Sequence, residues 1–419
     1  MIEMTGSSGG EGGGIGSDNI SHLQPNPDWT GLPIFDRTGW RRVRFGDVVN
    51  VVKETVDPSS GELDRYIAGE HMDSENVHLR RWGTVGNNYL GPAFIRRFRK
   101  GQVLYGSRRT YLKKVAYAEF DGITANTTLV LEAVEGKLHQ PLLPWIMLSE
   151  RFTEHSIRES KGSTNPYINW PDLAKFEFDL PPLDQQRRIA EVLWAVDEAY
   201  CEATSLTEIS ATLHRAYLRS VFATHNSNNR LPIRETGLVQ LGRQRAPKYQ
   251  TGTMTKPYLR VANVFDGRFD YDDILKMDFD ERDFEAYHLE KGDILLNEGQ
   301  SRELVGRCAI YDGTIEDCCF QNTLIRYRAG ENVLTEYAYA YFQYCFHFGI
   351  FAAIASQTTS VAHLGAERFG TLLMPVPQQE EQRRIAQSLD RIHEMELYLT
   401  QHLRKVCDLQ RKIIKHMIT

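Results

Sequence analysis

The chain has 419 residues, more than a single hydrophobic core usually supports, so the sequence predicts at least two domains. Hydrophobic residues make up 41% and charged residues 25%, the mean hydropathy is -0.42, and no apolar run approaches twenty residues, which excludes a membrane protein. The net charge of -6 weighs weakly against nucleic-acid binding, so the local distribution of charge has to decide.

The start of the chain has no targeting pattern. Residues 1–17 are rich in Gly and Ser and lack the charged and then apolar regions of a signal peptide. We therefore expect residues 1–35 to form a flexible tail and the protein to be cytoplasmic. The six cysteines are too sparse for a disulfide scaffold and include no Cys-x-x-Cys pair, which predicts reduced thiols and no metal site.

The first half combines short strands with one long helix. Residues 43–45, 102–105 and 128–131 are β-branched or aromatic runs bounded by Gly or polar clusters, so residues 36–180 are predicted to form a strand-rich domain. A helical region, residues 181–224, follows, and no Gly or Pro interrupts it from 184 to about 222. Its apolar residues alternate three and four apart, a heptad seam of Ile189, Val192, Val196, Ala199, Ala203, Leu206, Leu213 and Tyr217.

The second half has the same plan. Residues 225–376 are predicted to form a second β-rich domain, and residues 377–419 a second long helix. The seam of that helix consists of Ile385, Leu389, Ile392, Leu399, Leu403, Val406, Ile413 and Met417. The alternative, in which each helix packs only on its own domain, is disfavoured by the length of the helices.

An internal repeat connects the two halves. The motif Gln-Arg-Arg-Ile-Ala begins at Gln186 and again at Gln382, an offset of 382 − 186 = 196 residues. At the same offset, residues 126–127 (Asn-Thr) match residues 322–323, and residues 163–164 (Ser-Thr) fall on residues 359–360 (Thr-Ser). The matches predict a duplicated α+β protein, in which two β-rich domains each precede a long helix. The two helices are expected to pair as an antiparallel coiled-coil spacer, giving an internal pseudo-two-fold repeat.

Basic residues concentrate where acidic residues are missing. Residues 76–118 contain no Asp or Glu, and a weaker acid-free stretch covers residues 236–265. Lys neutralises phosphates, and the Arg fork can bond two acceptors on one guanine edge. The alternative is that the cations lie on an ordinary solvated face and that the aromatic residues between them form the core of strands. The predicted DNA-binding residues are Arg80, Arg81, Arg108, Arg109, Lys113 and Lys114 in the first half, and Arg243, Arg245, Lys248 and Arg260 in the second.

Catalytic motifs are absent from the sequence. It has no phosphate-binding loop, dinucleotide-binding glycine motif after a strand, His-Glu-x-x-His pair or Gly-x-Ser-x-Gly elbow, so we expect no catalytic residue. Residues 165–167 (Asn-Pro-Tyr) are similar to part of the Asn-Pro-Pro-Tyr loop of amino-methyltransferases. One Pro and the glycine-rich cofactor loop are missing, so we interpret these residues as a turn.

The repeated helix starts at Pro181 and Pro377 resemble those of type I restriction-modification specificity subunits. Residues 66–73 (YIAGEHMD) and 257–267 (PYLRVANVFDG) are similar to two varieties of their target-recognition domains, and the resemblance covers nearly the whole chain. It implies a non-catalytic subunit that reads a bipartite site in double-stranded DNA, one half-site per domain. Two methyltransferase subunits would dock on the helices and restriction and translocase subunits would complete the complex. Those partners would hold S-adenosylmethionine, ATP and Mg, with no cofactor bound by this chain.

Two alternatives remain open at this point. The same architecture could serve another restriction class in which one partner fuses methyltransferase and nuclease, and neighbouring genes would separate the two readings. A two-module interaction scaffold that does not bind DNA is supported by the acidic net charge.

Overall fold

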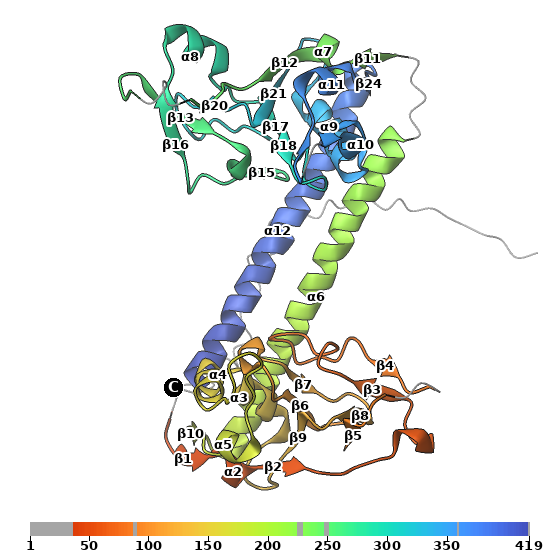
Figure 1. Cartoon of the computed structure of the whole chain (residues 1–419), viewed down its shortest axis with the longest axis vertical. Coiled ribbons are helices and arrows are strands. Elements are labelled where there is room, and N and C mark those ends of the chain that lie inside the picture. The colour runs from red at the N-terminus through yellow and green to blue at the C-terminus, as the bar shows by residue number, and fades with distance from the viewer. Residues whose placement is uncertain (1–36, 87–89, 224–228, 247–250, 358–359, 418–419) are drawn as a thin grey trace, which may run out of the picture. The chain divides into compact units, whose positions relative to one another are not determined.

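A computed structural model describes residues 37–86, 90–223, 229–246, 251–357 and 360–417 (Figure 1). The predicted tail, residues 1–35, lies outside the described residues. The chain divides into two units, Met1–Tyr200 with Lys405–Thr419, and Cys201–Arg404. Each unit is a mixed α/β domain that includes one end of each of the two long helices, α6 (Leu183–Phe222) and α12 (Gln379–Met417).

Unit 1 contains two four-stranded sheets and a two-stranded ribbon. The first sheet has the order β2 (Val49–Val52), β9 (Thr128–Ala133), β6 (Val103–Gly106), β7 (Val115–Tyr117). The second has the order β4 (Gly83–Thr84), β3 (Arg65–Ile67), β8 (Gly122–Ala125), β5 (Phe94–Phe98), and the ribbon pairs β1 (Arg41–Arg44) with β10 (Glu177–Leu180). The strands predicted at residues 43–45, 102–105 and 128–131 correspond to β1, β6 and β9.

Short helices cover the first sheet of unit 1. They are α2 (Phe45–Val48), α3 (Leu143–Leu148), α4 (Glu150–Arg158) and α5 (Trp170–Leu173), with 3-10 turns at η2 (Pro58–Ser60), η3 (Thr110–Leu112) and η4 (Gln140–Leu142). Their apolar residues Trp145 and Phe152 share one core with Leu193 of α6 and Ile413 of α12. Burial of these large side chains holds the ends of both long helices against the domain.

Unit 2 repeats the sheet order of unit 1. Its main sheet runs β12 (Gly237–Leu241), β21 (Leu324–Ala329), β17 (Ile294–Asn297), β19 (Cys308–Ile310), in the same chain sequence and pairing as β2, β9, β6 and β7. Each unit also has one parallel strand pair, Tyr66 opposite Ile123 in unit 1 and Tyr258 opposite Cys319 in unit 2. The duplication predicted from the repeat is therefore confirmed at the level of topology.

The remaining elements of unit 2 surround this sheet. The strands are β16 (Leu275–Asp278), β13 (Thr255–Leu259) and β20 (Cys319–Phe320) in one sheet; β18 (Gly299–Gln300), β23 (Ala362–His363) and β22 (Ser356–Gln357) in another; and the pairs β14 (Val264–Phe265) with β15 (Arg268–Phe269) and β11 (Arg230–Pro232) with β24 (Leu373–Pro375). The helices are α7 (Ile233–Thr236), α8 (Glu281–Tyr287), α9 (Thr335–His347), α10 (Ile350–Ile354) and α11 (Ala366–Thr371), with η6 (Val261–Asn263). Leu218 and Phe222 of α6 join Phe342, Phe369 and Ile385 in its core.

The first residue of the repeated Gln-Arg-Arg-Ile-Ala motif is buried in both units. Gln186 is 1% exposed, and its side-chain oxygen accepts a hydrogen bond from the backbone N–H of His139 at 2.8 Å. Its amide nitrogen donates to the carbonyl oxygens of Lys137 at 3.1 Å and Pro181 at 2.8 Å. The Gln186 side chain therefore joins the start of α6 to the loop between β9 and α3.

Gln382 makes the same three bonds in unit 2. It is fully buried, accepts from the N–H of Leu334 at 2.9 Å, and donates to the carbonyls of Asn332 at 3.0 Å and Pro377 at 2.9 Å. The repeat in sequence is thus a repeat in hydrogen bonding, because a buried amide must have all its polar atoms paired.

The predicted seam of α6 is wrong at two positions. Leu206 and Leu213 are 51% and 50% exposed, whereas Ser210 and His214 of the same helix are buried. Two rows of residues on this helix have the same seven-residue spacing: one contains Leu206 and Leu213, and the other contains Ala203 and Ser210. Periodicity alone therefore could not predict which row is buried. Among the described residues, no helix has the length and apolar character needed to cross a membrane.

We expect Gln382→Ala to lower the free energy of unfolding by about 2 to 4 kcal/mol, because three buried backbone groups lose their partner. Gln387→Ala, an exposed position on the same helix, should change it by less than about 0.5 kcal/mol. Denaturant unfolding of the two full-length variants measures both values, and equal effects would contradict the role given to Gln382.

Candidate nucleic-acid interface

The loop between β6 and β7 carries four of the predicted DNA-binding residues: Arg108, Arg109, Lys113 and Lys114. Arg109 and Lys113 flank η3 and have left-handed backbones, with φ of 50° and 47°. Positive φ is costly for residues other than Gly, and such strain concentrates at functional sites. The backbone N–H of Arg109 donates to the carbonyl of Pro166 at 2.7 Å, which helps to hold the loop in this conformation.

Two of the four cations in this loop have no counter-ion among the described residues. Arg108 and Arg109 are exposed, and within the described part of the chain neither side chain has an ion-pair or hydrogen-bond partner. Lys113 forms an ion pair with Glu75 at 2.6 Å, and Lys114 donates to the carbonyl of Gly69. The two guanidinium groups are therefore available to an external anion, while the lysines are tied to the neighbouring segment.

Arg80 and Arg81 are exposed as well. Arg81 forms an ion pair with Asp73, on the same segment as Glu75. The six cations predicted in the first half thus all lie at or near the surface, with three of them engaged by the segment of residues 69–75.

Other cations of the acid-free stretch belong to the fold. Arg97 pairs with Glu62, and Arg99 pairs with Glu54 at 2.8 Å. The hydrogen bond from Arg99 lowers the pKa of Glu54. The sequence run hides these pairs because the carboxylates come from segments outside it.

Two of the DNA-binding residues predicted in the second half, Arg243 and Arg260, are buried or half-buried. Arg243, predicted as a surface cation, is 7% exposed; it pairs with Asp283, donates to the carbonyl of Asp278 and lies over the ring of Phe279 at 5.1 Å. The prediction of a surface position is wrong, because this side chain is built into the domain. Arg260 is half-buried and pairs with Asp273.

The last two candidates and a neighbouring Asn complete the second half. Arg245 is exposed, and Lys248 lies outside the described residues. Asn263 is buried, and its amide donates to the carbonyls of Asp270 and Asp273, both at 3.0 Å, so it has a structural role.

A further cationic group in unit 2 was not predicted. The guanidinium groups of Arg268 and Arg307 lie over the ring of Phe265, at 4.4 and 4.5 Å from its centroid. Arg268 is exposed, whereas burial lowers the pKa of Arg307. No spacing in the sequence signals this group, because β14–β15 and β19 bring it together from distant positions.

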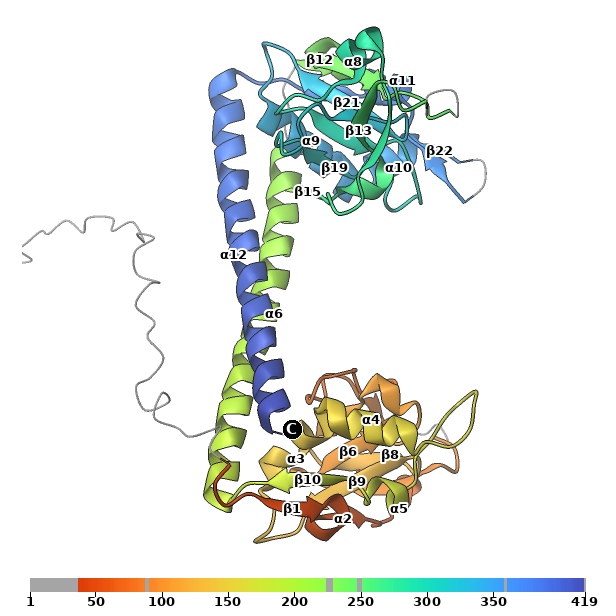
Figure 2. The same cartoon turned by 90° about the vertical axis from the view of Figure 1, so that its left-hand side faces the viewer.

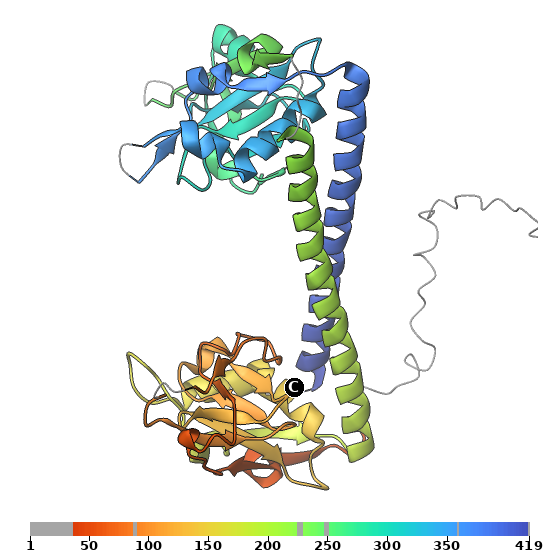
Figure 3. The same cartoon turned by 90° about the vertical axis from the view of Figure 1, so that its right-hand side faces the viewer.

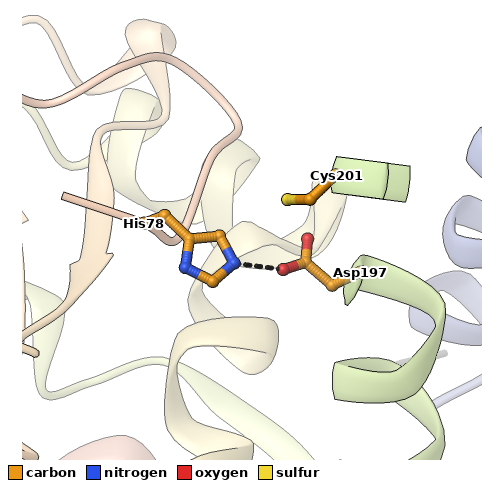
Figure 4. A group of neighbouring side chains, drawn as sticks. All are labelled: His78, Asp197 and Cys201. Atoms are coloured by element: carbon orange, nitrogen blue, oxygen red, sulfur yellow. Dashed lines mark hydrogen bonds and ion pairs between the residues drawn. The ribbon is translucent and has the colours of Figure 1, made fainter. Parts of the chain in front are cut away.

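His78 lies between the carboxylates of Asp197 and Glu119 in unit 1, and Figure 4 shows its contact with Asp197. Its Nε2 is 2.6 Å from Asp197 of α6 and its Nδ1 is 2.8 Å from Glu119. The hydrogen bond to Asp197 raises the pKa of His78 to about 9, with a smaller contribution from Glu119 and against the effect of burial. His78 is therefore an imidazolium at neutral pH, and Gln410 of α12 also donates to Asp197 at 3.1 Å.

This cluster is not a ready metal site. Cys201 follows Asp197 by one turn of α6, and the three residues include the donor types that bind transition metals (Figure 4). A metal ligand needs an unprotonated ring nitrogen, and both nitrogens of His78 are engaged by carboxylates. The cluster instead ties a loop of the first domain to the ends of the two long helices in unit 1.

The chain matches known proteins along most of its length. The family model described as the type I restriction modification DNA specificity domain matches residues 38–211 and again residues 237–406. The chain belongs to this type I restriction-modification DNA specificity family. The two matches cover the two repeated domains and most of the helix that follows each, in agreement with the duplicated topology of the specificity domains.

Individual relatives of the specificity family agree with this placement. The type I restriction enzyme EcoDI specificity subunit of Escherichia coli is 25% identical over 167 residues, 40% of this chain and 36% of that relative. The alignment therefore spans little more than a third of the relative's length.

Solved structures share the fold. The S subunit of a type I restriction-modification system from M. genitalium aligns with a TM-score of 0.58 at 14% identity, covering 91% of this chain and 96% of that one. A chain from a structure of complex assembly and conformational transition of the type I R-M system aligns with a TM-score of 0.57 at 19% identity, covering 90% and 96%.

We expect the His78 cluster to make stability depend on pH. Because the folded pKa of about 9 exceeds the ordinary 6.5, the stabilisation is fully present below pH 6.5 and is lost as the pH rises through 9. After allowance for solvent screening it amounts to about 1 to 2 kcal/mol. Denaturant unfolding between pH 6 and 10 should show this loss in the wild type and not in His78→Gln. His139→Gln, which removes a histidine with a lowered pKa, should keep the wild-type profile.

Proposed function

We propose that this chain is the DNA sequence-specificity subunit of a type I restriction-modification complex, in which each domain reads one half of a bipartite target in double-stranded DNA. The carrying observation is that one sheet order occurs twice while the loops on it differ. The β6–β7 loop of unit 1 presents Arg108 and Arg109, whereas the corresponding β17–β19 connection of unit 2 carries Gln300, Ser301 and Arg302. A common scaffold with different polar side chains suits the reading of two different half-sites.

We further propose that α6 and α12 form an antiparallel coiled-coil spacer that fixes the gap between the half-sites. Two contacts between the helices support this arrangement: Asp197 of α6 bonds Gln410 of α12 in unit 1, and His214 of α6 lies 3.3 Å from Glu396 of α12 in unit 2. The contact that comes first along α6 comes second along α12, as in an antiparallel pair. A helix of 40 residues spans about 60 Å.

The proposed division of the chain follows the repeat. Residues 36–180 and 225–376 are the two target-recognition domains, and residues 181–224 and 377–419 are the spacer. A β-ribbon, β1–β10 or β11–β24, comes immediately before each long helix and supports this division.

The chemistry of restriction and modification is assigned to partner subunits. In this proposal two methyltransferase subunits dock on the helices, and restriction and translocase subunits complete the complex, supplying S-adenosylmethionine, Mg and ATP chemistry in the cytoplasm. The exposed apolar row Leu206, Ile209 and Leu213 on α6 supports docking of a partner subunit there. Binding without catalysis is the role left to this chain.

Methylome sequencing tests the proposed function. A host that expresses this gene with its neighbours should carry N6-methyladenine in one split motif, two short half-sites with a fixed gap. Deletion of this gene alone should abolish methylation of that motif, and the restored gene should return it. An unchanged methylome in the deletion strain, with the neighbouring genes expressed, would falsify the proposal and favour a scaffold that does not bind DNA.

A second experiment tests the β6–β7 loop as part of the DNA surface. The test uses the complex purified with the products of the neighbouring genes. In it, Arg108→Ala/Arg109→Ala should make the negative slope of log affinity against log salt shallower by about 1 to 2, since each phosphate contact contributes about 0.9. The matched control is Arg42→Ala/Arg44→Ala, whose side chains are exposed but paired with Glu177 and Asp179. Equal slopes for the two double variants would remove Arg108 and Arg109 from the phosphate contacts.

A further inference from the structure

Each unit carries a short hairpin that packs on a loop of its main sheet. That loop follows β6 in unit 1 and β17 in unit 2. In unit 1, Tyr167 pairs with both Lys161 and Arg108; in unit 2, His363 pairs with both Ser356 and Gly299. The central residues differ by 363 − 167 = 196, the offset of the sequence repeat. The β22–β23 hairpin is visible in Figure 2, and its yellow counterpart after α4 in Figure 3.

The attachment of the two hairpins is also the same. The N–H of Ile168 donates to the carbonyl of Ser107 at 2.9 Å, and the N–H of Leu364 donates to the carbonyl of Glu298 at 2.8 Å. Ile168 and Leu364 are both buried, whereas Tyr167 and His363 next to them are exposed. The base of each hairpin is therefore anchored next to a buried residue, and in unit 1 residues 161–165 beyond the base are exposed.

The tip of the hairpin in unit 1, residues 161–165, is polar and exposed. Residues 161–165 (Lys-Gly-Ser-Thr-Asn) are all exposed and contain no acidic residue. Within the described residues, the side chains of Ser163, Thr164 and Asn165 make no hydrogen bond. Gly162 has a φ of 89°, which favours Gly at this position. Ser163, Thr164 and Asn165 are thus exposed beyond an anchored base, and their hydrogen-bond donors have no partner within the described residues.

The hairpin lies directly against Arg108 and Arg109 of the β6–β7 loop, which have no counter-ion within the described part of the chain. Arg108 pairs with Tyr167 through the backbone, and the N–H of Arg109 donates to Pro166 at 2.7 Å. Lys161 forms an ion pair with Asp172 at 2.7 Å, so the arginines and not this lysine supply the net positive charge. The hairpin and the adjoining loop thus carry hydroxyls, an amide and guanidinium groups, which are donors that contact phosphate oxygens in protein–DNA complexes.

The two units keep this hairpin although their neighbouring loops differ. A side chain that reads a base has to change with the half-site, whereas a contact to phosphate serves any sequence. The common geometry of the hairpin therefore points to the contact that both half-sites share.

Resting on the proposed function, we infer that the hairpin of residues 161–167 binds the phosphate backbone of DNA independently of sequence, and so positions the β6–β7 loop for reading. Ser163 and Thr164 are positioning residues, and the recognised ligand group is the phosphodiester.

Ser163→Asp/Thr164→Asp tests the inference against Lys137→Glu, which lowers the net charge by the same two units. Lys137 is exposed and lies past the Ala133 end of β9, whereas Ser107 follows Gly106, which pairs with Thr128 at the opposite end of that sheet. The complex with its partner subunits is titrated with a duplex that contains the methylated motif and with a scrambled duplex of equal length, after thermal unfolding has shown that the variants are folded.

We expect the hairpin variant to bind both duplexes at least about 10-fold more weakly and the control to change by less than about 2-fold, since added charge repels phosphate locally. The neutral variant Ser163→Ala/Thr164→Ala should weaken both by about 5-fold, leaving the ratio of the two affinities unchanged. A changed ratio would overturn the assignment in favour of base reading, and wild-type affinity in both hairpin variants would overturn any contact. A wild-type complex that binds neither duplex at any salt concentration would overturn the proposed function itself.

Discussion

The arrangement of each unit depends on one buried amide. Gln186 and Gln382 each join the first turn of a long helix to two carbonyls and one N–H of the preceding loop and turn. A charged or apolar side chain there would leave these groups unpaired in a dry environment, at a cost of several kcal/mol. The direction in which the helix leaves its domain is therefore set by hydrogen bonds, and apolar packing by Leu193 or Leu389 about two turns later reinforces it.

The architecture was predictable because a helix start imposes strict local requirements that show in the sequence. The Gln-Arg-Arg-Ile-Ala repeat predicted the duplication, and the two main sheets have the same strand order. The charge pairs were not predictable, because Arg243 meets Asp283 and Arg97 meets Glu62 across segments that are distant in sequence. An acid-free run therefore overestimates the free positive charge on the surface.

The covered row of α6 shows a second limit of periodicity. Ser210 and His214 are buried while Leu206 and Leu213 face solvent, so the inner face of this part of the helix is small and polar. The Nδ1 atom of His214 lies 3.3 Å from Glu396, so this member of the buried polar row has an acidic partner. A hydrophobicity pattern favours the apolar row, and only the position of the neighbouring helix reveals that a polar one is covered.

A net charge of -6 is compatible with a surface for DNA because the acidic residues near it are already engaged. Asp73 and Glu75 hold Arg81 and Lys113, which leaves Arg108 and Arg109 without a counter-ion among the described residues. Screening limits the reach of the remaining acidic charge to about 10 Å at 0.1 M salt, so the local sign and not the total governs contact with phosphate. In the proposed contact with DNA, the hairpin beside these arginines adds neutral donors, which strengthen binding without raising the attraction to unrelated polyanions. Position can thereby be fixed by groups that both domains share, and sequence by the loops in which they differ.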